Sequence, residues 1–235
     1  MNIALILSGG TGARLGTDIP KQYIEVCGKP IIHYCIESLS KHPAIDAIQI
    51  VANPAWHAQI EGCLSAADAE NKFKGFALPG ENRQLSIYSG LEAIRAYAND
   101  NDYVLVHDAA RPLLTAKQIS ECLEAVVGHD GVLPVLPMKD TVYASDDGKT
   151  VAALLDRKSI FAGQAPEVFV VGKYYEANKR LLSDRILTIN GSTEPAILAG
   201  MDIVMINGDE NNFKITTRSD LDRFEQILRN QAHVE

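Results

Sequence analysis

An apolar run at residues 3–7 leads into a glycine-rich turn, and this junction strongly constrains what the chain can fold into. The run predicts a buried strand. The turn begins at Ser8 and holds three glycines within four positions: Gly9, Gly10 and Gly12. Glycines allow a positive φ and a close approach of the backbone to a ligand, because no Cβ intrudes. Two cations follow at Arg14 and Lys21, so the stretch is suited to cradle an anionic group such as a polyphosphate.

This stretch differs from two other phosphate-binding motifs. It lacks the Lys-Ser/Thr ending of a Walker loop, which argues against ATPase-type phosphate binding. Its glycines at positions 9, 10, 12 and 16 do not fit the G-x-G-x-x-G pattern of dinucleotide-binding proteins. A glycine turn alone is weak evidence for a site. The two nearby cations strengthen the interpretation, because like charges are costly to bring together unless an anion lies between them.

Strand and helix patterns alternate along the chain. We expect strands at residues 3–7, 47–52, 76–78, 103–107, 131–137 and 203–206, and helices at 31–39, 54–67, 83–98, 116–127 and 219–230, the last capped by Ser219. This alternation predicts an α/β protein with a doubly wound, mostly parallel sheet, formed as one domain over residues 1–235. Ligands of such sheets bind at the carboxyl ends of the strands, where the glycine turn and His107-Asp108 both lie.

The pattern changes at residues 139–157. Short β-prone runs at 141–143 and 150–152 flank an Asp147-Gly148 pair. Such a pair between two short strands is a hairpin signal. We therefore predict a β-arm that projects from the parallel sheet.

Composition excludes several classes of protein. The formal net charge of −8 disfavours general nucleic-acid binding, so any phosphate site must be a local basic pocket. No apolar run approaches the roughly 20 residues of a membrane-spanning helix, and no basic segment with a cleavage site precedes the first strand. The cysteines are scattered without a C-x-x-C pair, which is typical of free thiols in a reducing compartment. We expect a cytoplasmic protein with no nucleic-acid or membrane partner.

Two motifs carry a resemblance to a known family. One is G-G-x-G-x-R-hydrophobic-G at residues 9–16 with Pro20-Lys21-Gln22 after it, and the other is His-Asp-Ala-Ala-Arg-Pro at residues 107–112. Residues 3–221 resemble the cytidylyltransferases that activate sugar-alcohol phosphates, among them the 2-C-methyl-D-erythritol 4-phosphate and ribitol 5-phosphate enzymes of isoprenoid and polyol-phosphate polymer biosynthesis. The resemblance implies the Rossmann-like fold of nucleotide-diphospho-sugar transferases. It also implies in-line attack of an acceptor phosphate on the α-phosphate of CTP, giving a CDP-alcohol and pyrophosphate.

The resemblance assigns the nucleotide side of the site. Arg14, Lys21 and Lys214 would stabilise the negative charge that builds up on the triphosphate. The nucleotide would be held by Ser8, Gly9, Gly10, Gly12, Gly80, Glu81, Arg83 and Ser86, with Ser86 helping to select cytosine. Asp108 is a suitable Mg²⁺ ligand because a carboxylate at a strand end can share the ion with substrate phosphates. His107 is assigned no catalytic role, since a buried histidine is more often hydrogen-bonded in the core.

The acceptor side follows from the same resemblance. Arg111, Thr141 and Arg157 match positions that would hold the phosphate of the acceptor alcohol, and an arginine can grip a phosphate through two hydrogen bonds. Arg157 would reach the site of a partner subunit, because the arm at residues 139–157 is implied to exchange contacts across a homodimer.

The sequence departs from the family pattern at two places on the acceptor side. A usual T-P-Q is Ala165-Pro166-Glu167 here, which removes a hydroxyl and adds a negative charge, and a usual Thr-Asp pair is Asn190-Gly191. The acceptor therefore stays open between ribitol 5-phosphate, 2-C-methyl-D-erythritol 4-phosphate and a third polyol phosphate. Two further alternatives are a nucleotidyltransferase that uses another base and a non-catalytic nucleotide-binding homologue.

Overall fold

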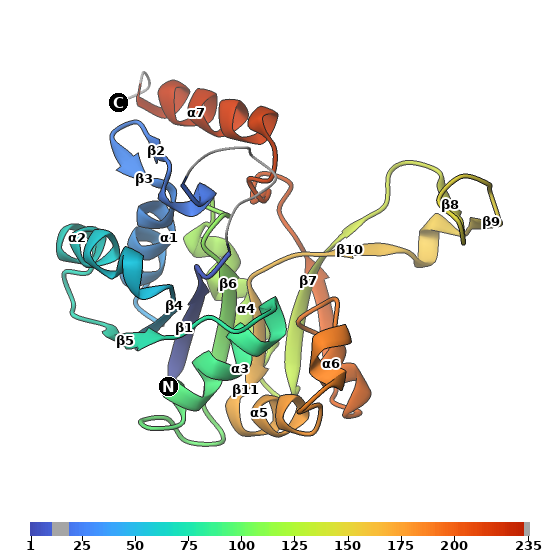
Figure 1. Cartoon of the computed structure of the whole chain (residues 1–235), viewed down its shortest axis with the longest axis horizontal. Coiled ribbons are helices and arrows are strands. Elements are labelled where there is room, and N and C mark those ends of the chain that lie inside the picture. The colour runs from blue at the N-terminus through green and yellow to red at the C-terminus, as the bar shows by residue number, and fades with distance from the viewer. Residues whose placement is uncertain (11–18, 233–235) are drawn as a thin grey trace.

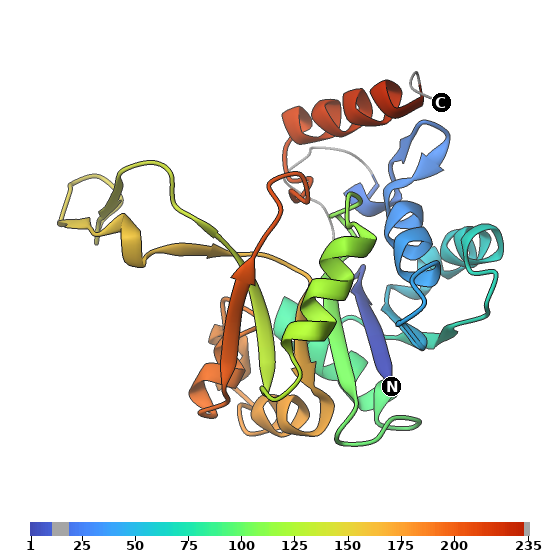
Figure 2. The same cartoon turned by 180° about the vertical axis from the view of Figure 1, so that it is seen from behind.

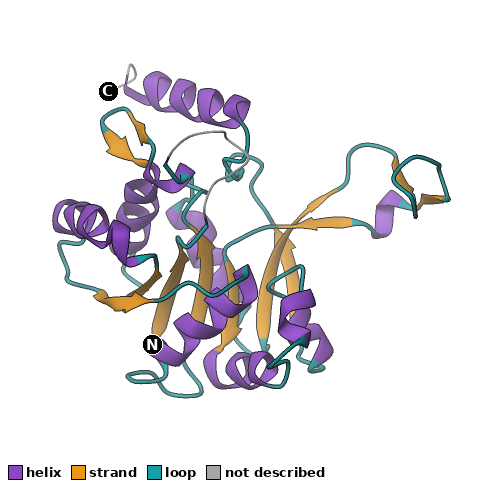
Figure 3. Cartoon of the chain, in the orientation of Figure 1, coloured by secondary structure: helices purple, strands orange, loops and turns teal. Residues whose placement is uncertain are grey.

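The computed structural model describes residues 1–10 and 19–232, and its centre is one mixed sheet (Figures 1 and 3). The strand order is β10-β7-β11-β6-β1-β4-β5, with β12 paired to β7. The strands are β1 (Asn2–Leu7), β4 (Ala47–Val51), β5 (Phe73–Ala77), β6 (Tyr103–Asp108), β7 (Gly131–Pro137), β10 (Phe161–Gly163), β11 (Glu167–Val170) and β12 (Ile203–Asn207). β1 pairs in parallel with both β4 and β6. The predicted α/β fold with a mostly parallel sheet is confirmed.

Helices cover both faces of this sheet, because alternate strand residues are apolar on each side. On β1, Ala4 and Ile6 belong to the core under α1 (Ile31–Ser40), α2 (His57–Ala67) and α4 (Ala116–Ala125). Ile3 and Leu5 belong to the opposite core, under α3 (Arg83–Ile94), α5 (Val171–Lys179) and α6 (Glu194–Leu198). Figure 2 shows α4, in yellow-green, lying across the face that is turned away in Figure 1.

The sheet departs from a purely parallel one near β11. β11 runs antiparallel to its two neighbours, β6 and β7, and β10 is antiparallel to β7. No strand or helix was predicted between the arm and residue 203, where the structure has β10, β11, α5 and α6. The strand predicted at residues 76–78 lies earlier in the structure, at Phe73–Ala77.

The arm projects from the sheet as predicted (Figures 1 and 2). It carries the antiparallel pair β8 (Val142–Ala144) and β9 (Ala153–Leu155). The second strand begins later than the predicted 150–152, because Asp147 Oδ1 accepts hydrogen bonds from the backbone N–H groups of Lys149 and Thr150, which holds both residues in the loop. Tyr143, Val151 and Leu154 are exposed on this arm.

The C-terminal helix α7 (Arg218–Ala232) lies over the carboxyl end of the sheet (Figure 1). It packs through Leu221 and Phe224 onto Ile31 and onto Val26 in the small β2 (Glu25–Val26)/β3 (Lys29–Pro30) hairpin. The predicted Ser219 cap is wrong. Thr217 Oγ1 accepts from Asp220 N–H, while Asp220 Oδ2 accepts from Thr217 N–H at 2.7 Å, so the two residues form a reciprocal capping box.

Short 3-10 helices complete the chain at Lys21–Tyr23, Pro54–Trp56, Arg157–Ser159 and Arg185–Thr188. The second of these forms the start of the segment predicted as one helix at residues 54–67. Within residues 1–10 and 19–232, no helix is long and apolar enough to span a bilayer.

Candidate functional site

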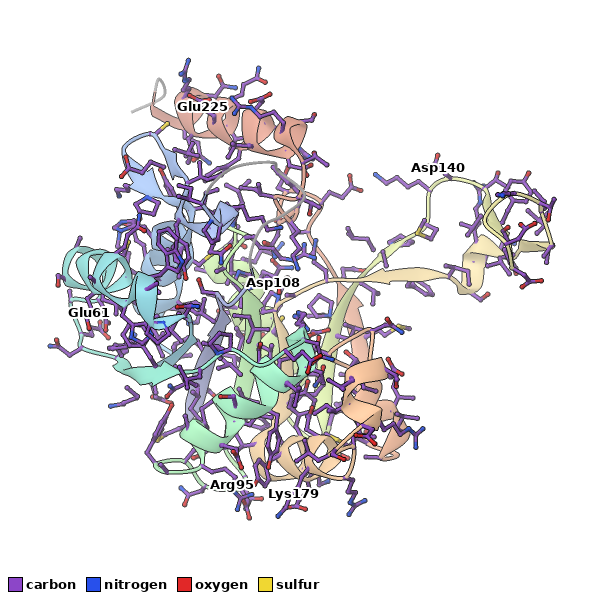
Figure 4. The ribbon with its side chains drawn as sticks, in the orientation of Figure 1. Glu61, Arg95, Asp108, Asp140, Lys179 and Glu225 are labelled. Atoms are coloured by element: carbon purple, nitrogen blue, oxygen red, sulfur yellow. The ribbon has the colours of Figure 1, made fainter. Side chains whose placement is uncertain are left out.

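A pocket of about 480 Å³ opens at the carboxyl end of the sheet. It is lined by Leu7, Gly9, Gly10, Lys21, Gln22, Gly80, Glu81, Asn82, Arg83, Ser86, Asp108, Ala109, Ala110, Lys214 and Thr216. These residues follow β1, β5, β6 and β12, so segments far apart in the sequence meet at one edge, as expected for parallel strands. Figure 4 shows Asp108 near the middle of the molecule, and Asp140 far out on the arm.

The glycine turn after β1 forms one wall of this pocket. A Cβ on Gly9 would lie 2.4 Å from Pro79 Cβ, so the turn needs glycine there. Gln22 Nε2 donates to the carbonyl oxygens of Ser8 and Gly10, at 2.8 and 2.7 Å. The Ser8 hydroxyl donates to Tyr23 Oη instead of lining the pocket, so Ser8 supports the turn. Gly12 and Arg14, which the sequence also assigns to the site, lie outside the described residues.

A second turn, between β5 and α3, forms the facing wall. Gly80 N–H donates to Ser86 Oγ at 3.0 Å, and Ser86 Oγ donates to the Asn82 carbonyl at 2.9 Å. Asn82 Oδ1 caps α3 by accepting from Leu85 N–H. These contacts hold Glu81 and Arg83 at the pocket wall. The role predicted for Ser86 stays a prediction, and its hydroxyl also fixes the shape of this turn.

Gly80→Ala should distort this turn and destabilise the protein. A Cβ at this position would lie 2.3 Å from Leu85 Cβ and 2.7 Å from the Leu85 carbonyl carbon, so the backbone must move. We expect a stability loss of about 1–3 kcal/mol, typical of overpacking, measured by denaturant unfolding. Gly62→Ala in α2 is the control: a Cβ there meets nothing within 4 Å, and alanine favours a helix. Unchanged stability in Gly80→Ala would refute this account of the turn.

Asp108 is the electrostatic centre of the pocket. Its Oδ1 accepts from Arg83 Nε and Nη2, both at 3.2 Å, and its Oδ2 accepts from Lys214 Nζ at 3.0 Å. Arg111 Nε lies 3.5 Å from Oδ2. These cations hold the pKa of the buried Asp108 carboxyl far below its usual range, although burial alone would raise it. Three cations around one carboxylate leave an excess of positive charge, as an anion-binding site requires.

A network of buried amides places Lys214. Asn212 Nδ2 donates to Gln118 Oε1 and to the Ala165 carbonyl, each at 2.9 Å. Gln164 Nε2 donates to the Asp209 carbonyl at 2.8 Å. The segment after β12 is therefore anchored on both sides of Lys214, because Ile215 N–H also donates to the Ala110 carbonyl.

Lys21 links an early segment of the chain to a late one. Its Nζ donates to the Ile215 carbonyl at 2.6 Å and lines the pocket beside Gly10. Lys21 and Lys214 thus approach the same pocket from opposite ends of the sequence. The structure therefore brings together the two described cations that the sequence analysis assigned to catalysis.

Arg111 lies on the far side of Asp108. It lines a neighbouring pocket, and its Nη1 donates to the Asn212 carbonyl at 2.8 Å. Its buried Nε has no hydrogen-bond acceptor in the described part of the chain. His107 is fully buried below, with Nε2 3.0 Å from the Arg111 carbonyl, and burial lowers the pKa of His107 to about 4. His107 is therefore neutral at pH 7 and supports the turn after β6.

Thr141 and Arg157 lie on the arm, and this chain does not bring them to the pocket. They line a hollow of about 400 Å³ together with Leu154, Leu155 and Asp156. Arg157 Nη1 donates to the Lys139 carbonyl at 2.8 Å.

The residues around Asp108 fit a magnesium ion only if a bound ligand supplies further oxygen ligands. The described residues contain no group of three or more histidine, cysteine or acidic side chains that could hold a metal together. Asp108 is a single carboxylate, and cations engage both of its oxygens. Mg²⁺ commonly binds through one or two carboxylates plus substrate phosphates. The donor set is therefore compatible with an ion that arrives with a polyphosphate.

Several residues of the site were given no specific role from the sequence. Gln22, Asn82 and Asn212 hold the turns and the strand end that form the pocket. Glu167 lines the neighbouring pocket. The first two had detectable signals, because Gln22 belongs to the Pro-Lys-Gln motif and asparagine is a favoured helix N-cap. Asn212 and Glu167 act through partners distant in sequence, and no local pattern identifies those partners.

The fold and the pocket define an α/β protein with a mostly parallel sheet and a cation-lined pocket at the carboxyl ends of its strands. More specifically, the chain belongs to the 2-C-methyl-D-erythritol 4-phosphate cytidylyltransferase (IspD) family, whose model matches residues 2–230.

Individual relatives give the same family and extend it. The chain is 32% identical over 227 residues to a bifunctional enzyme IspD/IspF of Bradyrhizobium diazoefficiens, covering 97% of this chain and 56% of the relative. It is 30% identical over 228 residues to a ribitol-5-phosphate cytidylyltransferase of Streptococcus agalactiae, covering 97% and 95%. It thus spans about half the length of the bifunctional relatives that it matches.

A solved structure supports the fold. The 4-diphosphocytidyl-2C-methyl-D-erythritol synthase of Anaerococcus prevotii superimposes with a TM-score of 0.82 at 23% identity, covering 97% of this chain and 96% of that one. At this identity the likeness concerns the fold.

Proposed function

We propose that the protein is a cytidylyltransferase that joins CTP to a sugar-alcohol phosphate, giving a CDP-alcohol and pyrophosphate. The observation that carries the proposal is the convergence of Lys21, Arg83 and Lys214 around one pocket at the carboxyl edge of the sheet, next to a glycine turn. Family membership supports cytidylyl transfer as the reaction. The acceptor is of the ribitol 5-phosphate or 2-C-methyl-D-erythritol 4-phosphate type.

The proposed mechanism is direct in-line attack, which needs no covalent enzyme intermediate. A phosphate oxygen of the acceptor attacks the α-phosphorus of CTP, and the bond from that phosphorus to the oxygen bridging the α- and β-phosphates breaks. Lys21, Lys214 and Arg83 stabilise the charge that builds up on the transferring and leaving phosphates. The backbone of the Gly80–Ser86 turn and the Ser86 hydroxyl hold the nucleotide. Arg14 is proposed to join the phosphate-binding cations.

Asp108 is the residue proposed to hold Mg²⁺. When bound, the ion neutralises charge on the triphosphate. For Asp108 to take this role, Arg83 and Lys214 must turn from its carboxylate towards the phosphates. Both side chains are about one third exposed, which leaves room for this movement.

The acceptor phosphate is proposed to bind Arg111, which lines the neighbouring pocket and pairs with Asp108 Oδ2 only at 3.5 Å. Thr141 and Arg157 would reach it from a partner subunit. The exposed Tyr143, Val151 and Leu154 of the arm support a homodimer in which the arms exchange contacts. We further propose that the protein acts in the cytoplasm.

The experiment that tests this function is pyrophosphate release from CTP and Mg²⁺ with single polyol phosphates. The panel contains ribitol 5-phosphate, 2-C-methyl-D-erythritol 4-phosphate, erythritol 4-phosphate and glycerol 3-phosphate, each repeated with UTP, GTP and ATP. We expect turnover with CTP and one acceptor, and its loss in Lys21→Ala. CTP binding without turnover on the whole panel would support a non-catalytic nucleotide-binding homologue, and turnover with another nucleotide would reassign the base.

A further inference from the structure

A second pocket of about 490 Å³ shares a wall with the first. Arg83, Asp108 and Lys214 line both. The remaining lining of the second pocket is mixed. It includes the apolar Leu133, Ala165 and Ile197 and the polar Glu167, Asn190, Ser192, Thr193 and Glu194. A molecule in this pocket would lie directly beside the phosphate-binding cations. Its walls offer hydroxyl, amide and carboxylate groups, which are suitable hydrogen-bond partners for the hydroxyls of a polyol.

Glu167 is the unusual residue of this pocket. It begins β11, is only 7% exposed, and has no ion-pair partner in the part of the chain that the structure describes. Its Oε2 accepts from Ser192 Oγ, and its Oε1 accepts from Thr193 Oγ1 at 3.2 Å. Burial raises the pKa of the Glu167 carboxyl more than the charge of Arg83 lowers it. Burying the Glu167 carboxylate is costly. In the described structure it is stabilised only by the two hydroxyl hydrogen bonds and by the more distant charge of Arg83.

A purely structural role does not require this charge. A glutamine side chain has the same shape, and its carbonyl oxygen could accept one of the two hydroxyl hydrogen bonds without the desolvation cost of a carboxylate. An ionised carboxylate differs in one respect: it only accepts, and each oxygen can take a second hydrogen bond. Ser192 and Thr193 occupy one position on each oxygen, so each oxygen can accept one further hydrogen bond, and Glu167 lines the second pocket.

We propose that Glu167 selects the acceptor, by accepting a hydrogen bond from a hydroxyl of the polyol chain in the second pocket. The inference rests on the proposed cytidylyl transfer and adds a residue that determines which polyol phosphate is accepted. The phosphate of the acceptor lies at the shared wall near Arg111, and the polyol chain extends towards Glu167, Ser192 and Thr193. An analogue that lacks this hydroxyl would leave the buried Glu167 carboxylate without a hydrogen-bond donor. Because that loss costs binding free energy, such an analogue is rejected.

The test compares wild type with Glu167→Gln, using the polyol phosphate that wild type turns over and its monodeoxy analogues. In Glu167→Gln we expect the KM for the acceptor to rise at least about tenfold, with the KM for CTP unchanged and kcat within about threefold. Wild type should reject one monodeoxy analogue much more strongly than the others, and the variant should lose this preference. Glu61→Gln, the same change on an exposed helix, is the matched control.

The readouts separate selection from folding and from the proposed function. Calorimetry of CTP binding and a thermal melt show whether Glu167→Gln is folded. Thr193→Val removes one hydrogen bond to the Glu167 carboxylate, and it should raise the KM for the acceptor as Glu167→Gln does. An unchanged acceptor KM and an unchanged preference among the analogues in a folded Glu167→Gln would overturn the inference while leaving cytidylyl transfer intact. Absence of turnover by wild type with every acceptor would instead overturn the proposed function, and the inference with it.

Discussion

Replacing Lys214 with methionine is expected to lower kcat by about 100- to 1,000-fold, the range found when one group that stabilises transition-state charge is removed. The Nζ of Lys214 lies 3.0 Å from Asp108 Oδ2 at the wall shared by both pockets. Methionine keeps the length and the apolar stem of the side chain but removes the charge. Steady-state pyrophosphate release, with CTP and the acceptor both saturating, measures the effect.

The control for this change is Lys117→Met, which removes a lysine on the exposed face of α4. The Lys117 side chain is 83% exposed and pairs only loosely with Glu121, at 3.7 Å. We expect wild-type kcat there, so that a loss in Lys214→Met is not an effect of net charge. A Lys214→Met enzyme with kcat within threefold of wild type would exclude Lys214 from transition-state stabilisation.

Asp108→Asn is expected to destabilise the folded protein by about 3 kcal/mol, as is typical when one partner of a buried ion pair is removed. The change leaves Arg83, Lys214 and Arg111 facing a neutral amide and repelling one another. For a domain of this size, the melting temperature should fall by about 6–12 °C. Asp222→Asn, in an exposed pair with Arg218 on α7, should cost less than about 1 kcal/mol.

The effect of Asp108→Asn depends on pH in a definite direction. The pKa of Asp108 is depressed in the folded state, so its contribution to stability is complete above the unfolded value of about 4 and declines as the pH falls below it. The gap between the melting temperatures of wild type and Asp108→Asn should be widest near neutral pH and narrow from about pH 4 downwards. A gap that is constant from pH 7 to pH 3 would show that the Asp108 charge is not what stabilises the fold.

The sequence predicted those parts of the fold that depend on local pattern. Ile3, Leu5 and Val104 are apolar because both faces of their strands are covered, and such runs separated by helical periodicity identify a parallel sheet. The placement of Asp108 followed because the carboxyl ends of parallel strands meet at one edge, whereas Lys21 and Lys214 were assigned by the family resemblance; all three line one pocket.

The features that the sequence did not predict are of two kinds. In some, two neighbouring residues could fill the same role, and in others the hydrogen-bond partner is distant in sequence. Thr217 and Ser219 are both favoured N-caps, and the apolar positions of α7 fit either start; Asp220, three residues after Thr217, decides the outcome through the capping box. The sequence did not reveal that the Ser8 hydroxyl donates to Tyr23 Oη, and the nucleotide-binding role of Ser8 stays a prediction. Glu167 was noticed only as an added charge, and its significance depends on Ser192 and Thr193, which come from another segment.

The hydrogen bond from Lys21 to Ile215 spans 194 residues of sequence, and the contact between Lys214 and Asp108 spans 106. The pocket is therefore complete only when the first and last strands in the sequence, β1 and β12, are both in the sheet. Contacts of such long sequence separation form slowly. A ligand that recognises the finished pocket distinguishes the complete native domain from partly folded forms, and by mass action it stabilises the domain as a whole.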